Sequence, residues 1–138
     1  MFETCQPLEQ IDVVAQELLD LIGDDGTVIL QGDLAAGKTT LVKAVATLMG
    51  ISEGVTSPTF SLQQCYDEKI FHYDIYNHGL EQFMSLGLFE ELEKPGLHFI
   101  EWGDDQLVEL LKAAGFELLK ITIAKEENKR CYTMTKIG

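Results

Sequence analysis

Basic residues are scarce in this sequence. Ten lysines and arginines stand against 23 aspartates and glutamates, which gives a formal net charge of -13 and a pI of about 4.4. Arg130 is the only arginine. Proteins that bind nucleic acids unaided gain most of their affinity from basic side chains that neutralise phosphates, and anionic membranes attract basic segments in the same way. We therefore expect no direct binding to nucleic acid or membrane, so any role on a nucleic acid must pass through a partner protein.

Long apolar runs and paired cysteines are also missing. No segment approaches the roughly 20 apolar residues of a membrane span, and no basic stretch precedes an apolar run near the N-terminus. The three cysteines, Cys5, Cys65 and Cys131, are widely spaced, and none belongs to a C-x-x-C pair. This cysteine usage favours reduced, mostly structural thiols in a cytoplasmic protein.

What the sequence does have is an ordinary globular composition, 46% apolar and 24% charged over 138 residues. This size and composition predict one domain, residues 1–138, with its own core. Helical and strand-like segments alternate, which indicates an α/β fold with a mixed, mostly parallel sheet flanked by helices. The expected helices cover residues 8–22, 38–49, 80–92 (interrupted at Gly87) and 105–114, and the expected strands cover residues 27–31, 60–66, 70–76, 97–102, 117–124 and 130–136. The strands at 60–66 and 70–76 are joined by a tight turn, so we expect them to pair antiparallel.

The segment between the first expected strand and the helix that follows it carries a phosphate-binding pattern. Residues 32–39 read GDLAAGKT and match G-x-x-x-x-G-K-[ST]. A turn that leads into a helix N-terminus offers phosphate several backbone N–H donors and the positive end of the helix dipole. In this pattern Gly37 lets the backbone approach closely, Lys38 reaches the β- and γ-phosphates, and the Thr39 hydroxyl binds magnesium. The segment predicts a single P-loop NTPase domain that binds Mg-ATP; the alternative is a glycine-rich turn with no ligand.

Three further motifs follow the loop in a fixed order: VTSPTF at 55–60, FHYDIY at 71–76 and FIEWGD at 99–104. Together with GDLAAGKTT they resemble the TsaE family, bacterial ATPases required for threonylcarbamoyladenosine synthesis in tRNA. The resemblance covers about residues 27–104, and the first helix also fits. It implies an accessory Mg-ATPase that acts on the partner proteins TsaD and TsaB, alongside a separate enzyme that makes the threonylcarbamoyl-adenylate intermediate.

The resemblance also implies roles for individual residues. Lys38, Asp74 and Glu101 would belong to the catalytic centre, and Thr39 and Glu101 would hold magnesium. Carboxylates at sheet ends suit these tasks, because magnesium prefers oxygen ligands and an attacking water needs orienting. The alternative for each carboxylate is a solvated surface charge. The residues implied to wrap the phosphates are Leu34, Ala35, Ala36, Gly37, Lys38, Thr39 and Thr40.

Several other residues keep two interpretations. Residues 57–59 (SPT) form either a plain turn or a switch loop that senses the γ-phosphate, and Trp102 either packs in the core or reports the nucleotide state. His72, His78 and His98 lack metal-ligand spacing, so we expect packing or surface roles for them.

The sequence departs from the family pattern at two positions. Ala35 stands where the family usually has glycine, and alanine disfavours positive φ, so the local conformation of the loop is open to question. Asn77 stands where the family commonly has arginine. A γ-phosphate arginine from this chain is then not expected unless Arg130 folds back.

A small-molecule kinase of the P-loop class is the alternative function. Such kinases usually need several basic residues around the transferred group, and beyond Lys38 this chain offers few. A GTPase is disfavoured because Asn128-Lys129 lacks the aspartate two residues later that guanine recognition needs. In addition, the D-x-x-G match at residues 20–23 precedes the loop instead of following it. We therefore expect ATP to be preferred over GTP.

Overall fold

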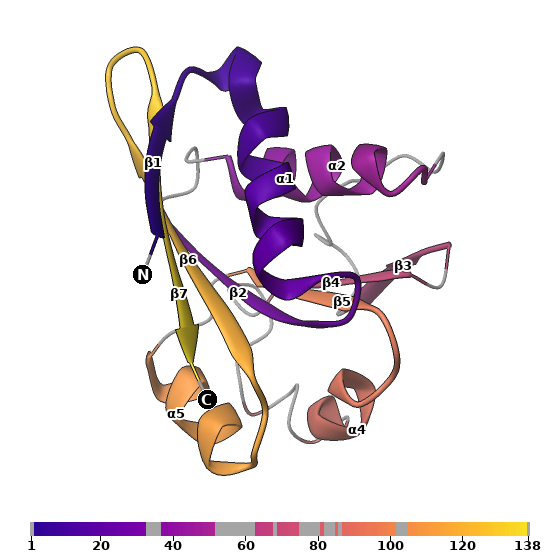
Figure 1. Ribbon diagram of the computed structural model, residues 1–138. Helices are drawn as coiled ribbons and strands as arrows, with labels where there is room; N and C mark the ends of the chain where they lie inside the picture. The colour runs from indigo at the N-terminus through magenta and orange to yellow at the C-terminus, as the bar shows by residue number, and fades with distance from the viewer. Residues whose placement is uncertain are drawn as a thin grey trace.

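The computed structural model describes residues 2–32, 37–51, 63–67, 69–74, 81, 85, 87–101 and 105–137. Within these ranges the chain forms one seven-stranded sheet with helices on both faces (Figure 1). The strands are β1 (Phe2–Gln6), β2 (Gly26–Gly32), β3 (Gln63–Tyr66), β4 (Ile70–Asp74), β5 (Leu97–Glu101), β6 (Leu118–Lys125) and β7 (Arg130–Ile137). The helices are the 3-10 turn η1 (Leu8–Gln10), α1 (Ile11–Ile22), α2 (Lys38–Leu48), α4 (Leu88–Leu92) and α5 (Asp105–Ala113). None of the described helices is long and apolar enough to cross a membrane.

The strand order β1-β7-β6-β2-β5-β4-β3 places β2 at the centre of the sheet. β2 pairs parallel with β5 and β6, and β4 pairs parallel with β5. β7 is antiparallel to both β6 and β1, and β3 is antiparallel to β4. Five of the described strands, all except β3 and β7, therefore run in one direction. The predicted α/β fold with a mixed, mostly parallel sheet is confirmed, as is the antiparallel hairpin.

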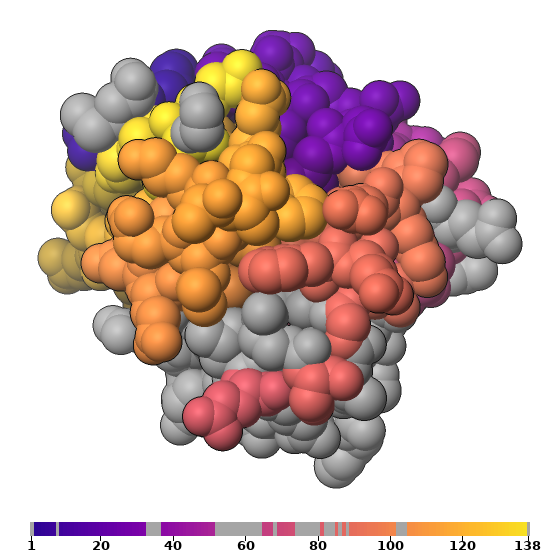
Figure 2. Space-filling view, turned by 90° about the horizontal axis from the view of Figure 1, so that it is seen from below, coloured from indigo at the N-terminus to yellow at the C-terminus, as the bar shows by residue number. Residues whose placement is uncertain are grey.

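The core lies on both sides of the sheet, because side chains of a strand alternate between its faces. Val28 and Leu30 of β2 pack with α1 and α2, whereas Ile29 between them packs with α5. All five residues of β5 are buried, as expected for a parallel strand covered on both faces. Figure 2 looks onto the face that carries α5 in orange and α4 in coral. The parallel strands are thus held rigidly between two helical layers.

The N-terminal strand β1 is the element that the sequence did not predict. Its residues alternate between partly buried and exposed positions, and it lies at the edge of the sheet, paired only with β7. The first α-helix begins at Ile11 instead of residue 8, because the Gln10 N–H donates to the Pro7 carbonyl at 2.9 Å and closes a 3-10 turn. The other element boundaries that lie within the described residues agree with the prediction to within a few residues.

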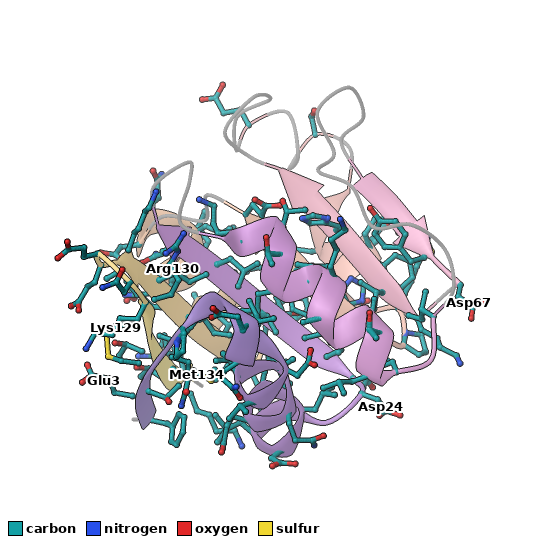
Figure 3. All side chains as sticks on the ribbon, turned by 90° about the horizontal axis from the view of Figure 1, so that it is seen from above. Glu3, Asp24, Asp67, Lys129, Arg130 and Met134 are labelled. Atoms are coloured by element: carbon teal, nitrogen blue, oxygen red, sulfur yellow. A yellow bond between two sulfur atoms is a disulfide. The ribbon has the colours of Figure 1, made fainter. Side chains whose placement is uncertain are left out.

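The expectation of reduced thiols is wrong for two of the three cysteines. Cys5 and Cys131 form a disulfide between β1 and β7, where they are directly paired in the strand register. Figure 3 shows it as a yellow bond close to Lys129 and Glu3. Cys65 is free and exposed. The two bonded cysteines are 126 residues apart, and only the pairing of an unpredicted strand brings them together.

Candidate active site

The carboxyl ends of three parallel strands lie side by side, and we call this end of the sheet the carboxyl edge. β2 ends at Gly32, β5 at Glu101 and β4 at Asp74, and the register pairs Glu101 with Asp74 on one side and with Leu30 on the other. Ligands of open α/β sheets bind outside this edge, where connections lead from strands into helices. The strand order therefore brings residues from three separate motifs to one place.

Helix α2 points its N-terminus at this edge. Gly37 precedes the helix with φ of 103°, a left-handed conformation that favours glycine. The helix begins at Lys38, as predicted, and its first turn closes where the Leu41 N–H donates to the Gly37 carbonyl at 3.0 Å. The backbone N–H groups of residues 38–40 precede this ladder and lie at the positive end of the helix, which favours an anion.

Lys38 lies over the end of β2. Its side chain is buried, with 3% of the residue exposed, and its ammonium group donates to the Gly32 carbonyl at 2.7 Å. A buried ammonium group requires such a partner. This contact joins the two ends of the phosphate-binding pattern and holds the cation beside the helix N-terminus.

Thr39 and Glu101 meet at the same point. The Thr39 hydroxyl donates to Oε2 of Glu101 at 3.1 Å. Glu101 is only 4% exposed, so it is not a solvated surface charge. Two side-chain oxygen atoms from residues that are 62 positions apart in the sequence are thus brought together beside the start of α2.

His72 is the residue that sequence reasoning missed. It is completely buried in β4, and its Nε2 is hydrogen-bonded to Oε2 of Glu101. The sequence predicted only a packing or surface role because no metal-ligand spacing surrounds it. The available signal was strand alternation: His72 lies two residues before Asp74, so both start from the same face of β4.

Of the other predicted positions, the structure describes Thr40 and the backbone of Asp74. Thr40 lies in the first turn of α2 and is partly buried, and the Asp74 backbone ends β4 opposite Glu101. The following predicted positions lie outside the described residues: Leu34, Ala35, Ala36, residues 57–59, Asn77, His78 and Trp102. The Asp74 side chain is not described either. Their roles remain predictions.

Arg130 begins β7 and pairs in register with Lys125 of β6. Because Ile123 of β6 pairs with Gly32, the hairpin tip extends past the end of β2 on the side of the phosphate-binding pattern. In Figure 3, Lys129 and Arg130 lie at one end of the molecule and Asp24 and Asp67 at the other. Two strand spacings, about 10 Å, still separate Arg130 from β2 across the sheet.

The opposite face of the sheet carries a second buried histidine. His98 of β5 is 1% exposed, its Nε2 donates to the Lys94 carbonyl at 2.8 Å, and its Nδ1 accepts from the Tyr73 hydroxyl at 2.8 Å. The Phe71 ring stacks on it at 4.5 Å between centroids. Burial lowers the pKa of His98 below its ordinary value of 6.5, and the hydrogen bond to Lys94 opposes that shift. The described hydrogen bonds and ring stack of His98 all lie with residues outside the candidate site.

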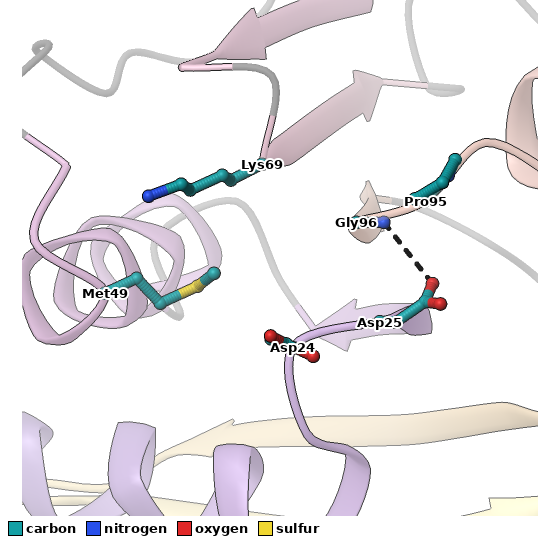
Figure 4. Close-up of a pocket in the computed structure, with 6 residues that line it drawn as sticks. All are labelled: Asp24, Asp25, Met49, Lys69, Pro95 and Gly96. Carbon is teal, nitrogen blue, oxygen red and sulfur yellow. Dashed lines mark hydrogen bonds between the residues drawn. The ribbon is translucent and has the colours of Figure 1, made fainter.

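A cavity of about 500 Å³ opens at the amino ends of β2, β4 and β5 (Figure 4). Lys38 and Glu101 lie at the opposite, carboxyl ends of these strands. Its lining carries both signs of charge, and the Gly96 N–H donates to Oδ1 of Asp25 at 3.3 Å. Phosphate ligands bind at the carboxyl ends of parallel strands, so we do not assign this cavity to the nucleotide. The lining residues are Asp24, Asp25, Met49, Lys69, Pro95 and Gly96.

Comparison with known proteins finds several chains of similar sequence. A tRNA threonylcarbamoyladenosine biosynthesis protein TsaE from Treponema pallidum is 42% identical over 93 residues, which are 65% of this chain and 69% of the relative. Proteins of the same description from Bacillus subtilis and Rickettsia felis are 34% and 30% identical over 79% and 92% of this chain, and the matches cover 68% and 75% of those relatives.

The fold agrees with these sequence matches. The crystal structure of YdiB from Bacillus subtilis superposes with a TM-score of 0.73 at 28% identity, covering 99% of this chain and 86% of that one. The fold is that of a P-loop NTPase. The family profile of the threonylcarbamoyl adenosine biosynthesis protein TsaE matches residues 5–132, and the chain therefore belongs to the TsaE family.

Proposed function

We propose that this chain is an Mg-ATP hydrolase that supports threonylcarbamoyladenosine synthesis in tRNA by acting on the TsaD and TsaB proteins. One observation carries the proposal: the Thr39 hydroxyl lies 3.1 Å from a buried Glu101 carboxylate, at the N-terminus of a helix that begins with a buried Lys38. Family membership supports the pathway, because the relatives are described as tRNA threonylcarbamoyladenosine biosynthesis proteins.

The phosphates would bind at the start of α2. The backbone N–H groups of residues 38–40 and the positive helix end favour the phosphate oxygens. Lys38 is already held beside them by its bond to Gly32 and would add a cation to the β- and γ-phosphates. Leu34, Ala35 and Ala36 would complete the loop.

The oxygen donors of Thr39 and Glu101 fit a magnesium ion. Magnesium usually binds proteins through one or two carboxylates together with substrate phosphates, and it does not require a cluster of protein ligands. The Thr39 hydroxyl and the Glu101 carboxylate would supply two such ligands, and the phosphates would supply others. Bound there, magnesium would neutralise charge on the phosphates during cleavage. Asp74, opposite Glu101 in register, would orient the attacking water.

The isolated protein should hydrolyse ATP slowly. In related phosphoryl-transfer systems, an arginine at the γ-phosphate contributes roughly 10³- to 10⁵-fold in rate. The single arginine here begins a strand two positions away from β2. A partner that supplies a cation or orders residues 57–59 would therefore raise turnover. By linkage, bound ATP would tighten the association with that partner by the same coupling energy.

Turnover measured in three additive steps tests the proposal: the protein alone, with TsaD and TsaB, and then with tRNA. We expect slow phosphate release alone, stimulation by the pair, tighter association with ATP than with ADP, and a preference for ATP over GTP. Lys38→Ala serves as the control for contaminating activity. Fast turnover that the partners do not change would contradict the accessory role, and phosphate transfer to a metabolite instead of water would favour the kinase alternative.

Salt dependence separates partner docking from direct tRNA binding. The chain carries a net charge of -13, so association with a basic partner should slow as salt rises. Direct binding to tRNA should stay undetectable at every salt concentration. A titration of labelled tRNA with this protein alone checks the second point, and measurable binding there would contradict it.

A further inference from the structure

His72 is a polar side chain buried without exposure in a strand of the core. Its Nε2 contacts Glu101, and its Nδ1 has no hydrogen-bond partner among the described residues. Burying an imidazole in an apolar layer costs free energy unless its polar atoms are hydrogen-bonded. The ring is therefore only half satisfied, and the half that is satisfied points to a residue of the candidate site.

The contact defines which ring nitrogen carries hydrogen. A carboxylate oxygen can only accept, so the hydrogen lies on Nε2 and is donated to Glu101. The Thr39 hydroxyl donates to the same oxygen, Oε2, at 3.1 Å. His72 of β4 and Thr39 of α2 thus both donate to one carboxylate oxygen of Glu101, which lies at the end of β5.

We propose that His72 is a positioning residue that orients the Glu101 carboxylate for magnesium. The inference rests on the proposed function, because it assigns Glu101 to the metal. Groups that hydrogen-bond to a metal ligand orient it, and their loss typically lowers metal affinity or activity about 10- to 100-fold. His72 itself touches neither nucleotide nor metal in this assignment.

The positioning role predicts an effect on magnesium that is separate from the effect on nucleotide. The first turn of α2 and Lys38 would bind the phosphates without help from His72, since Lys38 is hydrogen-bonded to the Gly32 carbonyl and His72 to Glu101. Removing the Nε2 donor would leave the Thr39 hydroxyl as the one partner of this carboxylate among the described hydrogen bonds. The affinity for nucleotide in the absence of metal should then stay near the wild-type value. The magnesium concentration needed for a half-maximal effect on binding should rise.

The chain offers a matched control in His98. It is equally buried, lies on the neighbouring strand, and stacks on Phe71, but both of its ring nitrogens are bonded away from the site. A substitution there disturbs the core to a similar degree without touching Glu101. It separates a loss of orientation from a general loss of packing.

The test measures binding of a fluorescent ATP analogue, first in EDTA and then across a magnesium titration, so that it does not depend on turnover. For His72→Phe, which fills the space without a donor, we expect the half-effective magnesium concentration to rise roughly 10- to 100-fold. Its affinity in EDTA should change less than about twofold, and His72→Gln, which keeps a donor near the Nε2 position, should recover most of the loss. His98→Phe should leave both quantities unchanged.

Equal magnesium shifts for His72→Phe and His98→Phe, or no recovery in His72→Gln, would overturn the positioning role. If wild type binds the analogue with no magnesium effect, the metal assignment to Glu101 fails, and if it does not bind at all, the proposed function itself fails. Should His72→Phe not fold, the ring-nitrogen NMR signals of wild type decide: hydrogen on Nε2 supports the proposal and hydrogen on Nδ1 overturns it.

Discussion

His72 and His98 are both buried on neighbouring strands, yet they contact very different groups. His98 gives both ring nitrogens to neutral partners, the Lys94 carbonyl and the Tyr73 hydroxyl. His72 contacts a buried carboxylate at the end of β5 and leaves Nδ1 without a partner among the described residues. The first arrangement completes a core, and the second holds a charged side chain in place.

The contrast extends to the two regions around them. Charged and polar groups from α2, β4 and β5 meet at the carboxyl end of the sheet: Lys38, Thr39, His72 and Glu101. Buried charges destabilise a fold unless they are paired, so such a cluster is retained at a cost to stability. Substitutions at the site should therefore change ligand binding more than stability, whereas substitutions elsewhere should do the reverse.

The largest effect should come from Lys38→Ala. It removes the cation that we propose for the phosphates, and we expect ATP affinity to fall at least about 100-fold, or roughly 3 kcal/mol. The free energy of unfolding, measured in urea, should change little because the lost group is a buried charge. Isothermal titration with Mg-ATP checks the first value. Wild-type affinity in this variant would show that residues 32–39 are not the phosphate-binding loop.

Glu101→Ala should affect turnover more than affinity, because the magnesium ligand that we propose there would act on the reacting phosphates. We expect kcat to fall about 100-fold and ATP affinity to fall much less. Asp74→Ala should show the same pattern. Single-turnover hydrolysis separates chemistry from binding, and unchanged rates in both variants would return the two carboxylates to structural roles.

The disulfide lies outside the candidate site, so we expect it to affect stability and not ligand binding. Reduction, or the Cys131→Ser substitution, should lower the free energy of unfolding by about 2 kcal/mol, since the bond restricts the unfolded chain but joins only an edge strand. ATP affinity should not change, because β1 lies three positions away from β2 in the sheet order. Urea unfolding with and without reductant measures the difference, and Cys65→Ser is the control. A loss of ATP binding on reduction would show that the two regions are coupled.

The smallest effect should come from His98→Phe, which keeps the ring stack on Phe71 but removes the hydrogen bond between the Tyr73 hydroxyl and Nδ1 of His98. We expect a loss of about 1 kcal/mol in the free energy of unfolding, with unchanged ATP affinity. Matched urea titrations of variant and wild type near neutral pH provide the value.

The pH dependence of the free energy of unfolding gives a further test of His98. Burial lowers the pKa of His98 in the folded state, so its contribution to stability is complete above the unfolded pKa of about 6.5. As the pH falls below that value, the unfolded chain binds a proton that the folded chain does not, and stability decreases. Urea unfolding from about pH 8 to about pH 5 should show a shallower acid loss in His98→Phe than in wild type. Equal slopes would mean that His98 does not titrate differently in the two states.

Much of the fold could be predicted because its signals are local. Helical periodicity, β-branched runs and glycine stops located α1, α2, α5 and the central strands to within a few residues. The strand β1 escaped prediction because an edge strand buries little of its surface, so FETCQ carries no clear apolar pattern. The disulfide escaped with it, since its two cysteines become neighbours only through the β1–β7 register.

The sequence by itself indicated the family and identified residues 32–39 as the predicted phosphate-binding segment, with Lys38, Thr39 and Glu101 as candidates, because each is part of a short motif whose spacing reflects backbone geometry. Only the tertiary structure decided that Glu101 is buried, that it meets Thr39, and that His72 shares the same oxygen. Those contacts join α2, β4 and β5, which the chain brings together through the strand order β2-β5-β4. Strand order depends on how helices pack over the whole sheet, and no local pattern of residues encodes it.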